Sequence, residues 1–184
     1  MEKQSHILLT GASRGIGKAI FETLDIAGTR IVGHASSARG NLIGADLSLP
    51  GAAEALWNAA LERLDGRIDV LVNNAGIFEP NPIDRSDIEW LDGWEQTMRI
   101  NLTASAELCR YAVRHWQETG LGGRIVNVAS RAAYRGDSPA HWHYAASKAG
   151  MVAMTKSIAR GYGTDGILAF SVCPGFTMTG MAEE

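Results

Sequence analysis

Short apolar runs alternate with longer stretches of helical periodicity along nearly the whole chain, and this alternation constrains the fold most. Strands are expected at residues 6–10, 30–35, 42–47, 70–73, 124–129 and 168–173. Helices are expected at residues 14–27, 52–64, 94–118 and 144–162. Because apolar strands that alternate with helices form parallel sheets covered on both faces, the pattern predicts an α/β fold, a doubly wound parallel sheet in a three-layer α/β/α sandwich.

Size and composition narrow the class of protein. The 184 residues are 46% hydrophobic and 20% charged, which predicts a single domain over residues 1–184 with a substantial core. A net charge of −3 gives no basic surface for nucleic acid. No run is long enough for a membrane helix or a signal-peptide core, so we expect no membrane partner and a cytoplasmic location. The two cysteines, Cys109 and Cys173, fit no metal spacing, and we expect reduced buried thiols and no metal site.

A glycine-rich turn follows the first expected strand. Gly11, Gly15 and Gly17 lie between the strand at residues 6–10 and the next helix. Glycine permits a tight turn and a close backbone approach, and a helix N-terminus binds phosphate. The turn predicts a dinucleotide site in a Rossmann-type sheet, with an ordinary strand–helix turn as the alternative.

The end of the second strand bears on the choice of cofactor. No acidic residue occurs in residues 34–39, whereas Ser36, Arg39 and the nearby Arg14 suit a 2′-phosphate. This favours NADP(H), with NAD(H) possible and a solvated Arg39 as the alternative reading. Asp46 ends the third strand and accepts a hydrogen bond either from the adenine amine or, as an N-cap, from backbone N–H groups.

Tyr144 and Lys148 are four residues apart within an expected helix. This spacing places a phenol and an ammonium on one face, one turn apart. A neighbouring positive charge favours the phenolate, so we expect Lys148 to lower the pKa of Tyr144 and make it a usable acid or base.

The sequence resembles the short-chain dehydrogenase/reductase family, close in pattern to its 3-oxoacyl-acyl-carrier-protein reductases. The matching segments occur in family order over nearly the whole chain, and a chance match of the ordered set is improbable. They are residues 10–17, 46–48, 73–76, 99–102, 127–130, 144–148 and 174–175.

The resemblance implies a catalytic tetrad. Tyr144 would be the general acid or base, and Lys148 would lower its pKa and bind the nicotinamide ribose. Ser130 would donate a hydrogen bond to the substrate oxygen, and Asn101 would interrupt a helix and hold a water that links the lysine to solvent. Each residue also has a structural alternative: Ser130 as a cap, Asn101 as a buried amide and Tyr144 as a core aromatic.

The resemblance also implies a cofactor site that ends near the nicotinamide at Pro174, Gly175 and Thr177. The residues around 73–76 would steady the central sheet and line the adenosine side. The full expected cofactor-binding set is Gly11, Ser13, Arg14, Gly15, Ile16, Gly17, Ser36, Asp46, Leu47, Asn73, Ala75, Gly76, Tyr144, Lys148, Pro174, Gly175 and Thr177.

The implied function is hydride transfer between NADP(H) and a secondary alcohol or ketone, of 3-oxoacyl type or another small carbonyl compound. A catalytically silent dinucleotide-binding sensor or scaffold is the competing hypothesis, and an epimerase or dehydratase is a third. The family forms homotetramers or homodimers through its two long helices, which correspond to residues 94–118 and 144–162.

The sequence departs from the family pattern in two places. Only residues 36–41 separate the second and third strands, where relatives carry a crossover helix, so we expect an irregular loop there. The chain stops at Glu184, and we expect that the family's substrate-covering loop and last strand are missing and that the sixth strand is an exposed edge.

Several other side chains are candidates for the pocket. Trp90, Trp94 and Trp142 either line an apolar substrate site or pack elsewhere, and His141 and His143 are expected as pocket-wall or exposed residues. Arg131 and Arg135 either bind an anionic substrate or form surface ion pairs, the default expectation.

Overall fold

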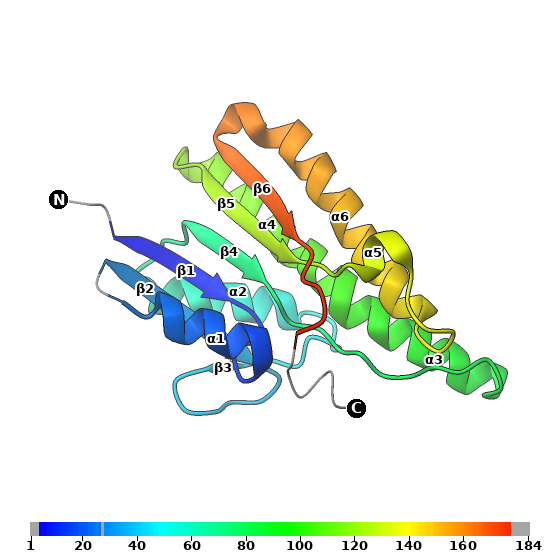
Figure 1. The fold of residues 1–184 in the computed structure, drawn as a ribbon. Coiled ribbons are helices and arrows are strands. Elements are labelled where there is room, and N and C mark those ends of the chain that lie inside the picture. Colours follow the sequence, from blue (N-terminus) through cyan, green and yellow to red (C-terminus); the bar gives the residue numbers. More distant parts are fainter. Residues whose placement is uncertain (1–3, 27, 178–184) are drawn as a thin grey trace.

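The computed structural model describes residues 4–26 and 28–177, which form a six-stranded parallel sheet (Figure 1). The strand order is β3-β2-β1-β4-β5-β6, so the direction of winding reverses between β1 and β4. This order confirms the predicted doubly wound, Rossmann-type sheet. The strands are β1 Ser5–Leu9, β2 Thr29–Ala35, β3 Ile43–Gly44, β4 Val70–Asn73, β5 Gly123–Val128 and β6 Ile167–Val172.

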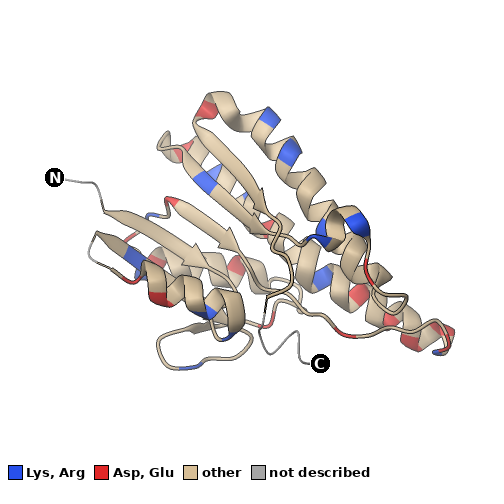
Figure 2. Ribbon diagram, viewed as in Figure 1, with Lys and Arg blue, Asp and Glu red and all other residues tan. Residues whose placement is uncertain are grey.

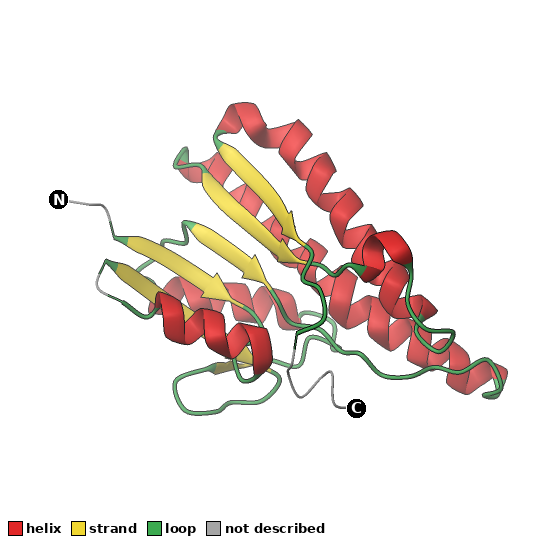
Figure 3. Cartoon of the chain, viewed as in Figure 1, coloured by secondary structure: helices red, strands yellow, loops and turns green. Residues whose placement is uncertain are grey.

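Helices cover both faces of the sheet, as Figure 3 shows. On one face lies α1 (Gly15–Leu24); on the other lie α2 (Ala52–Arg63), α4 (Ala104–Thr119) and α6 (Trp142–Tyr162). The arrangement is the expected three-layer sandwich. Two smaller elements were not predicted, the α5 turn (Ala132–Arg135) and a 3-10 turn at Gly163–Asp165. Ala27, the predicted last residue of the first helix, lies outside the described residues, and α1 ends at Leu24.

The apolar strands explain why the sheet is buried. In the described strands only Arg30 and Arg124 are charged, and other charged residues lie on helices and loops (Figure 2). Leu8, Leu71 and Ile125 are fully buried toward α2 and α4. Residues of opposite parity, such as Leu9, pack against α1. This alternation sends side chains of one strand to two separate cores.

The long helix predicted at residues 94–118 is two helices joined by a π-helical turn. α3 covers Asp87–Met98, the π turn covers Arg99–Thr103, and α4 follows. A capping box between Ser86 and Glu89 fixes the start of α3. Asn101 lies in this π turn, where the family resemblance implied an interrupted helix. The periodicity reading of one helix from residue 94 was wrong, because a π turn leaves little periodic signature and the capping box was not used.

The connection from β2 to β3 is an irregular loop, as expected, and it shortens the third strand. The loop turns at Gly40 (φ +56°), and Leu42 N–H donates to the Arg39 carbonyl at 3.0 Å. It then folds back over β3, where a Cβ on Gly44 would lie 2.2 Å from the Ala38 nitrogen. The predicted strand at residues 42–47 is therefore reduced to Ile43–Gly44.

A buried polar network joins the centre of the sheet to the helices behind it. Asn73 and Asn127 are register partners in β4 and β5, and the Asn73 amide donates to Asn127 Oδ1 at 2.9 Å. The Asn127 amide donates to Thr155 Oγ1 on α6 at 2.8 Å. Both asparagines are 0% exposed, so these bonds offset part of the cost of burying their amides. Among the described residues, Asn73 Oδ1 has no hydrogen-bond partner.

The sixth strand is at the edge of the sheet and pairs with β5 among the described residues. Ile167 points to the α6 face and is fully buried. Leu168, Phe170 and Val172 have the opposite parity and are each between 43% and 50% exposed. The edge position agrees with the expectation from the sequence. In the described part of the chain, no helix is long and apolar enough to cross a membrane.

Candidate active site

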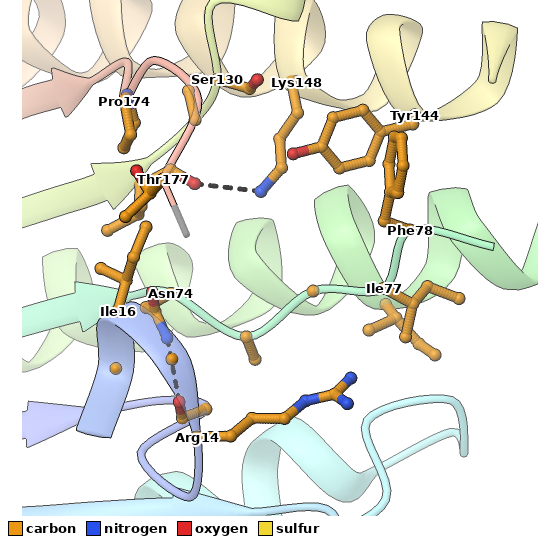
Figure 4. Close-up of a pocket in the computed structure, with 18 of the residues that line it drawn as sticks. Arg14, Ile16, Asn74, Ile77, Phe78, Ser130, Tyr144, Lys148, Pro174 and Thr177 are labelled. Carbon is orange, nitrogen blue, oxygen red and sulfur yellow. Dashed lines mark hydrogen bonds between the residues drawn. The ribbon is translucent and has the colours of Figure 1, made fainter. Parts of the chain in front are cut away.

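A crevice of about 500 Å³ lies at the carboxyl ends of the parallel strands. Its wall comes from the glycine turn, from the segments that follow β2, β3, β4, β5 and β6, and from one face of α6 (Figure 4). This is where a doubly wound sheet places its ligand, and the volume suits a ligand site.

The glycine turn has the geometry that its sequence predicted. Gly11 and Gly15 have positive φ angles of +68° and +54°, which favour glycine. A Cβ on Gly17 would lie 1.9 Å from the Gly11 carbonyl oxygen, so only glycine lets α1 pack this closely. Arg14, the N-cap of α1, makes no side-chain capping bond. The first N–H groups of α1 therefore point toward the crevice without a capping acceptor, a donor set that fits a pyrophosphate.

His34, at the end of β2, joins the glycine turn to the segment after β3. Gly11 N–H donates to His34 Nδ1 at 3.2 Å, and His34 Nε2 donates to the Ala45 carbonyl at 2.8 Å. Burial lowers the pKa of His34, so the neutral ring accepts at one nitrogen and donates at the other. The sequence interpretation assigned no role to His34, although its position at a strand end was a usable signal.

The segment after β4 is tied to the glycine turn by hydrogen bonds. Thr10 Oγ1 accepts from the backbone N–H groups of Asn74 and Ala75 at 2.9 and 3.0 Å. The Asn74 amide donates to the Gly11 carbonyl at 2.9 Å. Asn74 therefore lines the crevice, whereas the predicted Asn73 lies inside the core. The two asparagines differ because consecutive side chains of a strand point to opposite faces.

Tyr144 and Lys148 lie side by side on α6 and both face the crevice (Figure 4). The Lys148 ammonium is 5.7 Å from the centre of the Tyr144 ring. Lys148 is 4% exposed, and its Nζ donates to the Val128 carbonyl at 3.0 Å. The spacing of four thus produces the expected neighbours, anchored to the end of β5.

The expected effect of Lys148 on Tyr144 is wrong in this structure. Burial is the largest influence on the phenol and raises the pKa of Tyr144, while a hydrogen bond with Ser130 lowers it in part. Burial also lowers the pKa of Lys148 to about 8. The physical reason is that removing water disfavours both charged forms. Tyr144 is therefore a protonated phenol at neutral pH, the form that donates a proton.

Asn101 does not line the crevice, but its side chain forms hydrogen bonds with Ile77, which does. Its Oδ1 accepts from Ile77 N–H at 2.8 Å, and its amide donates to the Ile77 carbonyl at 3.0 Å and to Ser147 Oγ at 3.3 Å. A Cβ on Gly76 would lie 3.2 Å from Asn101 Oδ1 and 3.5 Å from Lys148 Nζ. Gly76 thus leaves open the space where these two polar groups converge.

Most of the predicted site residues come together on this one wall. Asn73 and Asn101 are the two that do not line it. Those that do are Gly11, Ser13, Arg14, Gly15, Ile16, Gly17, Ser36, Asp46, Leu47, Ala75, Gly76, Ser130, Tyr144, Lys148, Pro174, Gly175 and Thr177. Asp46 accepts hydrogen bonds from Ser48 N–H and Oγ, which lower its pKa. Arg39 lies outside the lining.

The tryptophans do not line the crevice. Trp90 stacks on Trp94 with ring centroids 5.4 Å apart, and the Trp142 ring lies 6.4 Å from Trp90. The pocket reading of these three residues is therefore wrong, because they pack against one another between α3 and the start of α6. His143 is buried at 2% exposure rather than on a pocket wall.

Phe78 lines the crevice and was missed by the sequence interpretation. Its ring stacks on His141, with centroids 3.9 Å apart and an interplanar angle of 7°. It also contacts the edge of Tyr144. The signal that could have found it is its place two residues after Gly76, beyond the end of β4. His141 therefore lies behind the wall, not on it.

Comparison with known proteins identifies the family. A family model described as short chain dehydrogenase matches residues 5–184. The chain belongs to the short-chain dehydrogenase family. This confirms the resemblance inferred from the motifs and makes the chain an NAD(P)-dependent oxidoreductase that acts on carbonyl and alcohol groups.

Relatives of this short-chain dehydrogenase include two bacterial reductases. The 3-oxoacyl-acyl-carrier-protein reductases FabG of Vibrio cholerae and of Escherichia coli K12 are each 37% identical over 188 residues, covering 96% of this chain and 75% of the relative. The chain thus spans about three quarters of their length. The ligand-free structure of Thermoplasma acidophilum aldohexose dehydrogenase superposes with a TM-score of 0.84 at 27% identity, covering 97% of this chain and 69% of the other.

Proposed function

We propose that this protein is a single NAD(P)-binding domain over residues 1–184 that reduces a small ketone, of 3-oxoacyl type or similar, with NADPH. The observation that carries the proposal is the convergence of Ser130, Tyr144 and Lys148 at the β5 and α6 side of the crevice. When bound, the cofactor supplies the hydride. The glycine turn and the start of α1 would hold its pyrophosphate, and Pro174, Gly175 and Thr177 would line its nicotinamide end.

The protein's own residues would then handle the proton and the charge on the carbonyl oxygen. Tyr144 donates its phenolic proton to that oxygen as the alcohol forms. Ser130 donates a hydrogen bond to the same oxygen, where negative charge develops. Lys148 supplies a positive charge close by, and Asn101 positions the segment after Gly76 that faces the lysine.

The raised pKa of Tyr144 supports the direction of this reaction. A phenol that stays protonated at neutral pH is ready to donate, whereas the reverse oxidation needs the phenolate. We therefore expect the enzyme to be ready for the rate of ketone reduction at neutral pH, and the rate of alcohol oxidation to increase as the pH rises.

The decisive experiment is Tyr144→Phe, assayed by NADPH absorbance with a panel of ketones. We expect turnover to fall by at least about 100-fold while NADPH binding, measured by fluorescence titration, is retained. Tyr162→Phe, at the far end of α6, is the matched control and should keep full activity. Near-normal turnover by Tyr144→Phe would refute the assignment. Cofactor binding by the wild type without reduction of any ketone would favour the silent binder.

Arg14 and Ser36 support the preference for NADPH, because both line the crevice near the ends of β1 and β2. Arg14→Gln should weaken NADPH binding about tenfold, the scale of a lost charged hydrogen bond, and leave NADH binding nearly unchanged. Arg39→Gln is the control, since Arg39 does not line the crevice. Tighter binding of NADH than NADPH by the wild type would overturn the preference.

The proposal includes a homotetramer or homodimer formed through α4 and α6. Exposed apolar side chains next to these helices, Ile88 and Leu91 on α3 and Trp142 on α6, support it. Light scattering after size-exclusion chromatography tests it, and a monomer at micromolar concentration would contradict it.

A further inference from the structure

Two arginines occupy the wall of the crevice beside the proposed catalytic residues. Arg131 directly follows Ser130, and Arg135 ends the α5 turn. Both line the crevice together with Ser130 and Tyr144. Figure 2 shows blue segments of ribbon at this turn, in front of α6.

The backbone of this turn is fixed to the site. Arg131 N–H donates to the Pro174 carbonyl at 3.1 Å, and Ala132 N–H donates to Ser130 Oγ at 3.1 Å. Gly136 N–H donates to the Ala132 carbonyl at 3.0 Å and closes the turn. The backbone that carries the two arginines is therefore hydrogen-bonded to Ser130 itself. This keeps both guanidinium groups within the length of an arginine side chain of that fixed backbone.

Neither arginine forms an ion pair with any described residue, so the structure gives no support there to the default expectation of surface ion pairs. Arg30, Arg67 and Arg99 do pair, with Asp65, Asp69 and Glu107. Asp137 lies on the same wall, but it accepts a hydrogen bond from Ser138 N–H at 2.8 Å instead. With the Lys148 ammonium, the wall next to Ser130 therefore carries three cationic groups and one carboxylate, a net charge of about +2 at neutral pH.

The basic pair is separate from the other arginine of the crevice. Arg14 lies in the turn after β1, whereas Arg131 and Arg135 follow β5, and β4 runs between these two strands. The ends of the crevice thus have different basic groups. Arg14 suits the adenosine side of a cofactor, and Arg131 and Arg135 share the lining with Ser130 and Tyr144, where the substrate ketone would lie.

We propose, resting on the proposed reductase function, that the substrate carries an anionic group close to its ketone and that Arg131 and Arg135 bind this group. Guanidinium groups present paired donors that match carboxylate and phosphate oxygens. Because Arg131 adjoins Ser130, the anion lies within one arginine side chain of the reacting carbonyl. This chemistry describes a short keto acid or a phosphorylated ketone rather than a carbonyl at the end of a long neutral arm.

The test compares matched pairs of substrates in the NADPH assay. One pair is 3-oxobutanoate and N-methyl-3-oxobutanamide, and the other is dihydroxyacetone phosphate and dihydroxyacetone. The pairs separate a carboxylate from a phosphate as the source of the charge. The variants are Arg131→Gln, Arg135→Gln and the double variant. Arg160→Gln, an exposed arginine on α6 outside the crevice lining, is the control.

We expect the wild type to favour the anionic member of at least one pair by about tenfold or more in kcat/KM. Each single variant should reduce that preference about tenfold, mainly through KM, and leave the neutral member within about twofold. Arg160→Gln should change neither. Reduction of both members with equal efficiency, or a preference that the variants leave intact, overturns the anion site while the reductase function stands.

A binding measurement separates the two proposals if no ketone is reduced. Calorimetric titration of 3-hydroxybutanoate and of glycerol 3-phosphate, each in the presence of NADP+, reports the anion site without turnover. Binding that the double variant abolishes supports the anion site even though the reductase proposal has failed. Absence of arginine-dependent binding for both anions overturns it.

Discussion

The ring of Phe78 packs edge-on against the ring of Tyr144, with centroids 4.7 Å apart and an interplanar angle of 81°. Phe78 is in turn held by its stack on His141, whose Nδ1 lies 2.6 Å from Ser138 Oγ. An edge-to-face pair of this kind adds about 0.5–1.5 kcal/mol beyond simple burial. Phe78 therefore acts as a positioning residue that fixes the phenol and keeps water from one side of it.

Phe78→Ala should lower kcat for ketone reduction about tenfold, because the Tyr144 ring gains freedom. It should also shift the alkaline limb of the pH profile to lower pH. Burial raises the pKa of Tyr144, so added solvent returns that pKa toward its ordinary value. Phe78→Tyr keeps the ring and should restore both readouts. A fall in kcat with an unmoved pH profile would leave Phe78 a purely structural role.

Lys148→Met should stabilise the fold at neutral pH while it abolishes turnover. Burial lowers the pKa of Lys148 from 10.5 to about 8, so below pH 8 the folded state carries the full cost of a buried charge. Between about pH 8 and 10.5 the unfolded chain binds more protons, and wild-type stability from this group rises with pH. The gain at pH 7 should be about 1–3 kcal/mol, reduced by the lost bond to Val128.

Urea denaturation at pH 7 and pH 10 measures this effect. The difference between Lys148→Met and wild type should be largest at pH 7 and small at pH 10. Lys156→Met, which removes an exposed lysine from the same helix, is the control and should show no such trend. A variant less stable than wild type at pH 7 would contradict the prediction.

Gly17→Ala and Gly161→Ala are a matched pair within helices. A Cβ on Gly17 would overlap the Gly11 carbonyl at 1.9 Å, whereas nothing lies within 4 Å of a Cβ on Gly161. Gly17→Ala should cost at least about 2 kcal/mol and weaken NADPH binding. Gly161→Ala should gain about 0.5–1 kcal/mol because alanine favours helix. Thermal melts and cofactor titration check both, and equal effects would show that the close approach at Gly17 is unimportant.

Asn101→Ala removes three hydrogen bonds between the π turn, the segment after β4 and α6. We expect a loss of about 2–4 kcal/mol, because Ile77 N–H is left without its acceptor. We also expect a fall in kcat as that segment shifts relative to Lys148. Asn58→Ala, an exposed position on α2, should be neutral by the same denaturation assay. Normal stability of Asn101→Ala would show that water replaces the amide at no cost.

Most strands and helices could be predicted from the sequence, because the periodicity of apolar residues determines which segments form them. The strand predicted at residues 70–73, of which residues 70–72 are apolar, lies where predicted. The strand predicted at residues 30–35 begins one residue earlier, at Thr29. The third strand is only Ile43–Gly44, where the preceding loop folds close over Gly44, and the apolar pattern of residues 42–47 does not report that approach. The π turn at Arg99–Thr103 depends likewise on Asn101 bonding to Ile77, twenty-four residues away.

Much of the candidate site could also be predicted from local sequence motifs. Motif residues that follow strand ends meet at one edge, as the parallel sheet requires. Which of two adjacent asparagines faces the crevice depended on the pleat, and Asn73 pointed inward. The pKa of Tyr144 depended on the depth of burial, which the spacing to Lys148 does not report. Phe78 was recognisable only in the folded structure, which brings its ring against Tyr144.

The paired amides of Asn73 and Asn127 have a further consequence for the two halves of the crevice. If β4 slid past β5 by one residue, the two amides would separate and each would be buried among apolar neighbours. The loss would be about 1–3 kcal/mol of folding free energy for each amide. The strand ends that carry Asn74 and Ser130 are thereby locked in step. The pyrophosphate side of the crevice and the hydroxyl of Ser130 therefore keep their mutual alignment through a pair of amides buried within the sheet, out of reach of any ligand.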